Sequence, residues 1–63
     1  MQRNRRYEAF YDDGHDYGSF RFWSDHRANS KPNFEDAEAE AKILFGYRRA
    51  SQMTITSTQL VEC

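Results

Sequence analysis

The chain of 63 residues has one cysteine and no long apolar run, and these absences argue against several classes of protein. Its single cysteine, Cys63, cannot form an internal disulfide, whereas secreted domains of this size usually need several. No apolar run reaches about 18 residues, so we expect no membrane span. The basic start, with Arg3, Arg5 and Arg6, has no hydrophobic region after it, and nothing follows Cys63, so we expect neither a signal peptide nor prenylation. We predict a reducing, cytoplasmic setting.

The chain also lacks an excess of charge of either sign. Nine Lys and Arg residues face ten Asp and Glu residues, which gives a net charge of -1. The general attraction to phosphate that marks most nucleic-acid binders is therefore not expected, and any basic patch must be local. The length predicts a single domain over residues 1–63, with residues 1–5 as a flexible lead-in. Dimerisation is a natural supplement to so small a core.

No catalytic or metal-binding signature is present. The two histidines and one cysteine show none of the spacing that zinc requires. Residues 12–16 (DDGHD) are rich in oxygen ligands but lack the pattern of a calcium loop, and Asp and Gly are typical of a hairpin turn. Ser24, Asp25 and His26 have the residue types of a hydrolase triad, but neighbours in sequence do not give its geometry. We expect no catalytic residue, metal or cofactor, and predict a protein that is not an enzyme.

Aromatic residues are what the chain has in abundance, with five Phe, four Tyr and one Trp. A chain this small cannot bury them all, so some are expected to be exposed and available to a partner. Two short segments on either side of the turn at residues 12–16 hold six of them: Tyr7, Phe10, Tyr11, Phe20, Phe22 and Trp23.

The pattern around this turn predicts a β-hairpin. Residues 5–11 and 19–24 mix aromatic and polar residues, and an Asp-Gly step lies between them. Alternation places Phe20 and Phe22 on one face, in the core, and Ser19, Arg21 and Trp23 on the other. Residues 53–61 form a third predicted strand; the alternation sets Met53, Ile55 and Val61 on one face and Thr54, Thr56 and Thr58 on the other.

A helix is predicted over residues 34–45. It follows a loop at residues 26–33 that contains Pro32, and Asn33 is the expected N-cap, with Glu35 and Asp36 in the first turn. Gly46 is a natural stop. Ile43 lies opposite the apolar stripe and is expected to be exposed or covered by another element. The stripe that should pack on the sheet holds Phe34, Ala37, Ala41, Leu44 and Phe45.

These elements predict an α+β domain of ββαβ order, in which one helix packs on one face of a three-stranded antiparallel sheet. The other face has no second layer to cover it. Trp23, together with Arg21, Arg5 and Arg6, is the candidate contact surface on this face. Other residues expected there are Thr54, Thr56, Glu8 and Phe10.

One segment resembles a group of known proteins. Residues 24–33 read SDHRANSKPN and are followed by Glu35, Asp36 and Ala37. This stretch is similar to small accessory proteins encoded by bacteriophages and prophages. The resemblance implies a cytoplasmic protein of an infected bacterium, where such small products often bind and block host enzymes, CRISPR nucleases among them. It brings no functional motif, so no binding residue is carried over from it.

We predict a phage-type inhibitor of a host defence nuclease, similar to anti-CRISPR proteins, that acts by stoichiometric occlusion. The first alternative is a small binder of single-stranded nucleic acid, since residues 18–22 faintly resemble the aromatic strand of RNA-recognition sheets. The second is a structural homodimer in which open faces or edges of two sheets pair. The residues predicted to bind the partner are Trp23, Arg21, Tyr17, Phe10, Glu38, Glu40 and Arg48.

Overall fold

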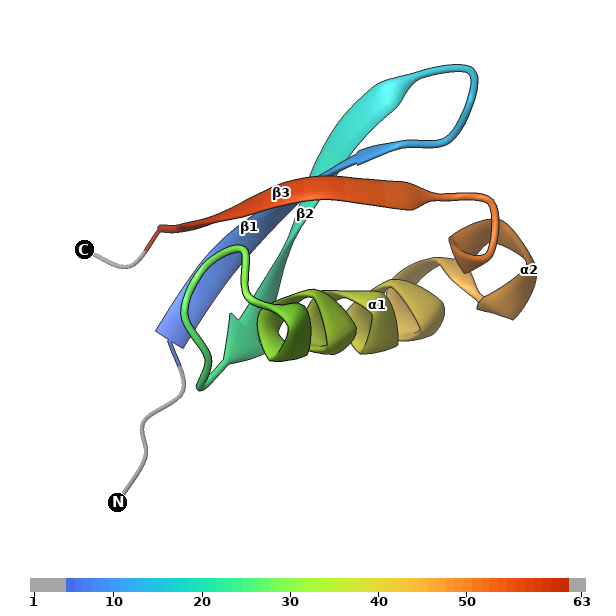
Figure 1. Cartoon of the computed structure of the whole chain (residues 1–63). Coiled ribbons are helices and arrows are strands. Elements are labelled where there is room, and N and C mark those ends of the chain that lie inside the picture. Colours follow the sequence, from blue (N-terminus) through green and yellow to red (C-terminus); the bar gives the residue numbers. More distant parts are fainter. Residues whose placement is uncertain (1–4, 62–63) are drawn as a thin grey trace.

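The computed structural model describes residues 5–61, and these form a three-stranded antiparallel sheet with helices (Figure 1). Strand β1 lies between the other two strands, and α1 crosses one face of the sheet (Figure 1). The predicted α+β class and ββαβ order are confirmed, with one short helix, α2, added in the connector. The elements are β1 (Arg5–Asp12), β2 (Tyr17–Ser24), α1 (Lys31–Phe45), α2 (Tyr47–Ala50) and β3 (Thr54–Leu60).

The β1–β2 hairpin supplies most of the core, as its alternation predicts. Tyr7 and Ala9 of β1 are buried beside Phe22 and Phe20 of β2, which pair with them directly. The rings of Tyr7 and Phe22 are stacked with their centroids 5.7 Å apart, and the Phe20 ring meets Phe45 of α1 edge-on at 5.8 Å. Such aromatic pairs add about 0.5–1.5 kcal/mol each beyond the burial of their area.

The end of this hairpin near the turn depends on one glycine. Tyr11 pairs with Gly18, and its ring lies across the place that a side chain at Gly18 would occupy. A Cβ at Gly18 would meet the Tyr11 hydroxyl at 2.5 Å. The glycine therefore lets the Tyr11 ring lie over β2, where it packs against Phe20 and Phe45.

Strand β3 departs from the predicted alternation. Its register against β1 shifts between Phe10 and Tyr11: Ile55 pairs with Tyr11, whereas Ser57 pairs with Phe10. One extra residue on β3 therefore interrupts the period of two, as a β-bulge does. The prediction that Thr58 lies on the open face is wrong, because after the bulge Thr58 is opposite Ala9 and buried.

Helix α1 begins three residues earlier than predicted. Ser30 is the N-cap, and its hydroxyl accepts a hydrogen bond from the Asn33 N–H at 3.3 Å, so the prediction of Asn33 as N-cap is wrong. Pro32 lies in the first helical turn, where its missing N–H has no partner to lose. Glu35 and Asp36 consequently lie beyond the first turn. Gly46 ends the helix as predicted, and its N–H donates to the Lys42 carbonyl.

The face of α1 that packs on the sheet is narrow. Ala37 and Ala41 are buried, and their small side chains let the helix approach the aromatic rings of the hairpin closely, with Phe45 packing beside them. The prediction that Leu44 belongs to this stripe is wrong, since half of Leu44 is exposed. At about 100° per residue it lies about 60° around the helix from Ala41, at the margin of the stripe. Ile43 is exposed.

Polar side chains tie the loop before α1 to the outer side of β3. Asn33 is fully buried; its amide nitrogen donates to the His26 carbonyl at 2.9 Å, and its amide oxygen accepts from the Thr58 hydroxyl at 2.6 Å. Asn29 accepts from the Thr58 backbone N–H at 2.9 Å and donates its own N–H to the Thr58 hydroxyl at 2.8 Å. Its φ of 64° is left-handed, which Asn tolerates. We call Asn29, Asn33 and Thr58 the β3 clamp.

Two predictions concern the ends of the chain. The flexible lead-in over residues 1–5 falls outside the described residues except for Arg5, which pairs with Ser24 as the first residue of β1. Cys63 also lies outside the described residues. No helix within residues 5–61 is long and apolar enough to cross a membrane.

Candidate interaction surface

The sheet face opposite α1, which we call the open face, carries cross-strand rows of side chains. It is built from the alternate residues of each strand, and within residues 5–61 no helix covers it (Figure 1). The rows, read from β2 through β1 to β3, are Trp23 with Arg6; Arg21 with Glu8 and Gln59; Ser19 with Phe10 and Ser57; and Tyr17 with Asp12 and Thr54. Three predicted contact residues, Trp23, Arg21 and Phe10, are thus neighbours on one rigid surface, as alternation requires.

Trp23 is the largest exposed group of this surface. Solvent reaches 56% of Trp23, although an indole ring usually stabilises a fold most when it is buried. The Arg6 guanidinium carbon lies 4.8 Å from the centroid of the Trp23 ring, so one face of the indole holds a cation. This contact is worth about 0.5–1 kcal/mol at an exposed site, and it fixes the ring in place before any partner arrives.

The charges of the open face balance. The two positive residues, Arg6 and Arg21, are matched by two negative ones, Glu8 and Asp12, so the net charge of the open face is zero. Glu8 accepts a hydrogen bond from the Ser19 hydroxyl at 2.5 Å, and Arg21 has no ion pair with any carboxylate of residues 5–61. The Arg21 guanidinium therefore keeps all its donors available, while no extended positive field surrounds it.

Two more predicted residues sit at the margins of the open face. Tyr17 begins β2 at the turn end of the hairpin and is 86% exposed, on the same face as Trp23. Arg5, predicted beside Arg6 on this face, instead pairs with buried Ser24 and so follows the alternation of the helix side. That part of the prediction is wrong because consecutive residues of a strand point to opposite faces.

The structure separates three of the four charged predicted residues from the aromatic ones. Glu38 and Glu40 are on α1, and Arg48 is on α2, so all three lie on elements away from the open face. Glu38 is exposed at the rim of a hollow on the helix side, and Glu40 is half-buried. The aromatic anchors and the acidic residues therefore cannot belong to a single flat contact.

The hollow beside Glu38 has a volume of about 440 Å³. Its floor is apolar, with Ala41, Ala50, Met53 and Ile55, and this places it between α1, α2 and β3. Lys42, Tyr47 and Ser51 form the remaining rim, where the Lys42 ammonium lies 5.7 Å from the Tyr47 ring centroid. The volume falls within the range of small-molecule sites, but the only charged groups on its rim within residues 5–61 are Glu38 and Lys42, and the Ser51 hydroxyl already donates to the Arg48 carbonyl.

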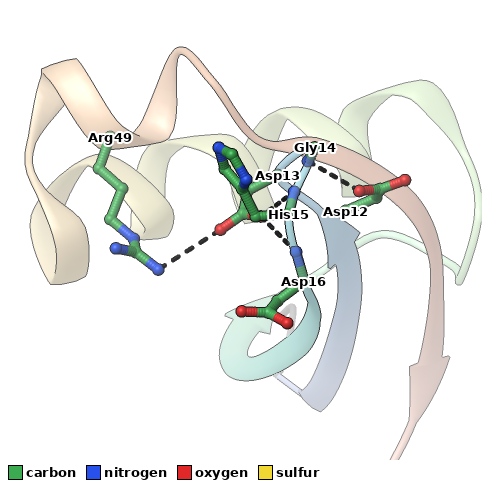
Figure 2. A network of polar contacts seen from close by, with 6 residues as sticks. All are labelled: Asp12, Asp13, Gly14, His15, Asp16 and Arg49. Atoms are coloured by element: carbon green, nitrogen blue, oxygen red, sulfur yellow. Dashed lines mark hydrogen bonds and ion pairs between the residues drawn. The ribbon is translucent and has the colours of Figure 1, made fainter.

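The oxygen-rich turn is a self-contained hairpin connection (Figure 2). Asp13 accepts hydrogen bonds from the backbone N–H groups of Asp16 at 2.8 Å and His15 at 3.0 Å, and Asp12 accepts from Gly14 at 2.8 Å. These backbone donors, with a smaller contribution from Arg49 at 3.5 Å, hold the pKa of Asp13 below its ordinary value of 3.8. Within residues 5–61 no group of three His, Cys, Asp or Glu residues is placed to hold a metal ion.

Ser24, Asp25 and His26 do not form a catalytic arrangement in the described structure. Ser24 is buried at the end of β2; its hydroxyl donates to Asp36 of α1 at 2.7 Å and accepts the backbone N–H of His26 at 3.0 Å. The hydroxyl is therefore engaged in joining the sheet to the helix and in turning the chain after β2.

Sequence reasoning missed the β3 clamp. The signal available was the pair of asparagines, Asn29 and Asn33, on either side of Ser30 and Pro32, since asparagine side chains commonly bond to nearby backbone groups. Its partner Thr58 is far along the chain, so only the fold identifies it.

Comparison with protein-family models, with curated protein sequences and with solved structures finds no match to this chain.

Proposed function

We propose that this protein binds another protein through its open face and so inhibits a nucleolytic defence complex of a bacterial host by stoichiometric occlusion. The observation that carries the proposal is the position of Trp23, more than half exposed, on a rigid strand beside Arg21. Trp and Arg are the residues most enriched at the energetic centres of protein interfaces. The Arg6 guanidinium holds the Trp23 ring, so Trp23 loses little conformational entropy on binding.

The balance of charge favours a protein partner over nucleic acid. Binders of single strands combine stacking aromatics with a groove of positive charge that follows the phosphates. On the open face Glu8 and Asp12 offset Arg6 and Arg21, and one face of the Trp23 indole is already occupied by Arg6. Interleaved charges of both signs instead suit a protein surface with a complementary pattern.

The class of target rests on the resemblance of residues 24–37 to phage and prophage accessory proteins. Small single-domain products of this kind act in the bacterial cytoplasm and block host enzymes by covering a surface.

The experiment is a pull-down from bacterial lysate with the tagged protein, run with and without nuclease treatment, followed by a cleavage assay on the retained complex. We expect a stoichiometric protein that survives nuclease treatment and whose nucleolytic activity falls as the small protein is added. The variant Trp23→Ala should lose retention and inhibition together, because it removes the central anchor. The matched control is Ile43→Ala, since Ile43 is an apolar residue on α1 that is even more exposed than Trp23.

Salt dependence separates this function from the nucleic-acid alternative. Neutralising several phosphates makes affinity fall steeply as salt rises, whereas a mixed aromatic and polar protein interface changes little. Retention of nucleic acid alone, with a steep loss of affinity in salt, contradicts the proposal. So does a protein that leaves every nucleolytic complex of the host unbound and fully active.

A further inference from the structure

Hydrogen-bonded and non-hydrogen-bonded residue pairs alternate along β1 and β2, and this alternation determines which backbone groups of β2 point away from β1. In the turn the Asp13 N–H donates to the Asp16 carbonyl at 3.2 Å, so residues 13 and 16 form a hydrogen-bonded pair. Such pairs alternate along an antiparallel ladder. The backbone groups of residues 18, 20, 22 and 24 therefore face β1. Those of Tyr17, Ser19, Arg21 and Trp23 face away from it.

The hydrogen bonds between β1 and β3 independently support the same alternation along β1. The alternation turns Arg6 toward β3 and Ala9 toward β2, and the structure shows the Val61 N–H donating to the Arg6 carbonyl at 3.0 Å. Thr58, opposite Ala9, has its N–H directed away from β1 and bonded to Asn29.

The outer side of β2 is thus an unprotected sheet edge. Apart from the ladder to β1, no hydrogen bond within residues 5–61 engages the backbone of residues 17–23. The strand has eight residues, no proline and no register shift against β1. Folds usually block such an edge, because it is a template for another strand.

Pairing of this edge with a second copy has one favourable register. In such a dimer, open-face side chains of both copies lie on the same side only if the numbers of two paired residues add up to an even value. The two even sums that pair the largest number of β2 residues are 40 and 42. A sum of 42 sets Arg21 opposite Arg21 of the other copy, and like charges directly opposite are unfavourable. A sum of 40 sets Trp23 opposite Tyr17, Arg21 opposite Ser19 and Phe22 opposite Gly18, with no like charges paired.

We infer that the protein forms a symmetric dimer in which the β2 strands of two copies pair antiparallel about Phe20, giving one continuous six-stranded sheet. The outward backbone groups of Tyr17, Ser19, Arg21 and Trp23 then find partners in each other. The exposed Trp23 and Tyr17 rings meet across the junction, and the two open faces join into one surface. Dimerisation also supplements a core that, within residues 5–61, holds six buried hydrophobic residues. This inference stands apart from the proposed function, since it is tested without any target.

The first test is sedimentation of the purified protein from about 10 μM to about 1 mM, with fluorescence of the only tryptophan, Trp23, as a second readout. We expect a monomer–dimer equilibrium and a change of emission along the same curve. Arg21→Pro should abolish the dimer, because it removes an outward N–H while sparing the ladder to β1, the position at which an edge strand tolerates proline.

A charge exchange tests the register and does not depend on the proline variant folding. Ser19→Arg places arginine opposite Arg21 of the other copy at two symmetric positions, and should weaken the dimer about 2- to 30-fold. The double variant Ser19→Arg with Arg21→Glu converts both positions to ion pairs and should restore it. The matched control, Gln59→Arg, adds the same charge on β3 of the same face and should leave the dimer unchanged.

Three results would overturn the inference. One is a monomer at every concentration. Another is a dimer that persists in the folded proline variant or is insensitive to the charge exchange, since it must pair through another surface. The third is a monomer whose capture of a target protein is lost in Arg21→Pro but kept in Arg21→Ala, which would assign the edge to a strand of the target, because only the proline removes the outward N–H.

Discussion

The two edge strands of the sheet are attached to β1 in opposite ways. The rings of Phe20 and Phe22 hold β2 against the core, and the outward backbone groups of residues 17–23 have no hydrogen-bond partner within residues 5–61. β3 is rich in threonine; at Thr58 its outward backbone N–H donates to Asn29, and the Thr58 hydroxyl donates to Asn33. Aromatic packing thus leaves an edge available for association, whereas a polar clamp closes it. This difference is the reason that we place the proposed dimer contact at β2 and not at β3.

The largest expected effect comes from removing the aromatic support of β2. Phe22 is 1% exposed and stacks on Tyr7, so Phe22→Ala should cost about 3–5 kcal/mol through lost transfer energy and a residual cavity. That is comparable to the whole stability expected of so small a core, and we expect an unfolded protein by circular dichroism. Ile43→Ala, at an exposed position, should change the free energy of unfolding by less than about 0.5 kcal/mol. Equal effects of the two would contradict the assigned core.

The polar clamp of β3 should contribute less than the aromatic support of β2. Thr58→Val keeps the shape of the side chain but removes the hydroxyl that joins the Asn29 N–H to the Asn33 amide oxygen. Leaving these groups unpaired should cost about 1–3 kcal/mol, measured by urea unfolding. Thr54→Val is the control, because Thr54 is exposed on the same strand. A neutral Thr58→Val would show that the clamp does not stabilise β3.

Two substitutions at Asn29 separate the stability due to its side-chain hydrogen bond from the stability due to its left-handed backbone conformation. Asn29→Gly keeps the left-handed φ of 64° but loses the side-chain oxygen that accepts from Thr58, whereas Asn29→Ala loses the oxygen and also strains the backbone. We expect both variants to be less stable, and alanine to be worse by about 1 kcal/mol in urea unfolding. Equal losses would indicate that the loop relaxes out of the left-handed conformation.

The hairpin could be predicted from sequence, because residues 5–11 and 19–24 alternate with a period of two around an Asp-Gly turn. The same alternation predicts, without knowledge of the tertiary structure, that Trp23, Arg21 and Phe10 share one face of the sheet. The bulge in β3 could not be predicted, since residues 54–58 (TITST) contain polar residues in either phase.

The start of α1 could not be predicted either, because Ser30 and Asn33 are both good capping residues. What decides between them is the buried hydrogen bond between Asn33 and Thr58, which are distant in sequence. The separation of Glu38 and Arg48 from the aromatic anchors has the same cause, since it depends on which sheet face α1 covers.

The smallest expected effect is at the turn that joins the free edge strand to β1. Backbone N–H groups of Asp16 and His15 hold the pKa of Asp13 below 3.8 in the folded protein. Because the folded pKa is the lower one, its contribution to stability is present above 3.8 and is lost as the pH falls through the folded pKa. Asp13→Asn should therefore be less stable than the wild type at neutral pH, and the difference should shrink below pH 3.8.

The measurement is urea unfolding of both proteins from neutral pH to well below 3.8. Asp16→Asn is the matched control, because the Asp16 side chain makes no hydrogen bond within the described residues. Arg49→Gln should retain most of the pH dependence, since the backbone donors dominate and Arg49 contributes less. A difference between Asp13→Asn and the wild type that stays constant through this range would mean that the N–H groups bind the carboxyl and the carboxylate equally. The turn would then owe its shape to Gly14, whose φ is 92°, and not to the charge of Asp13.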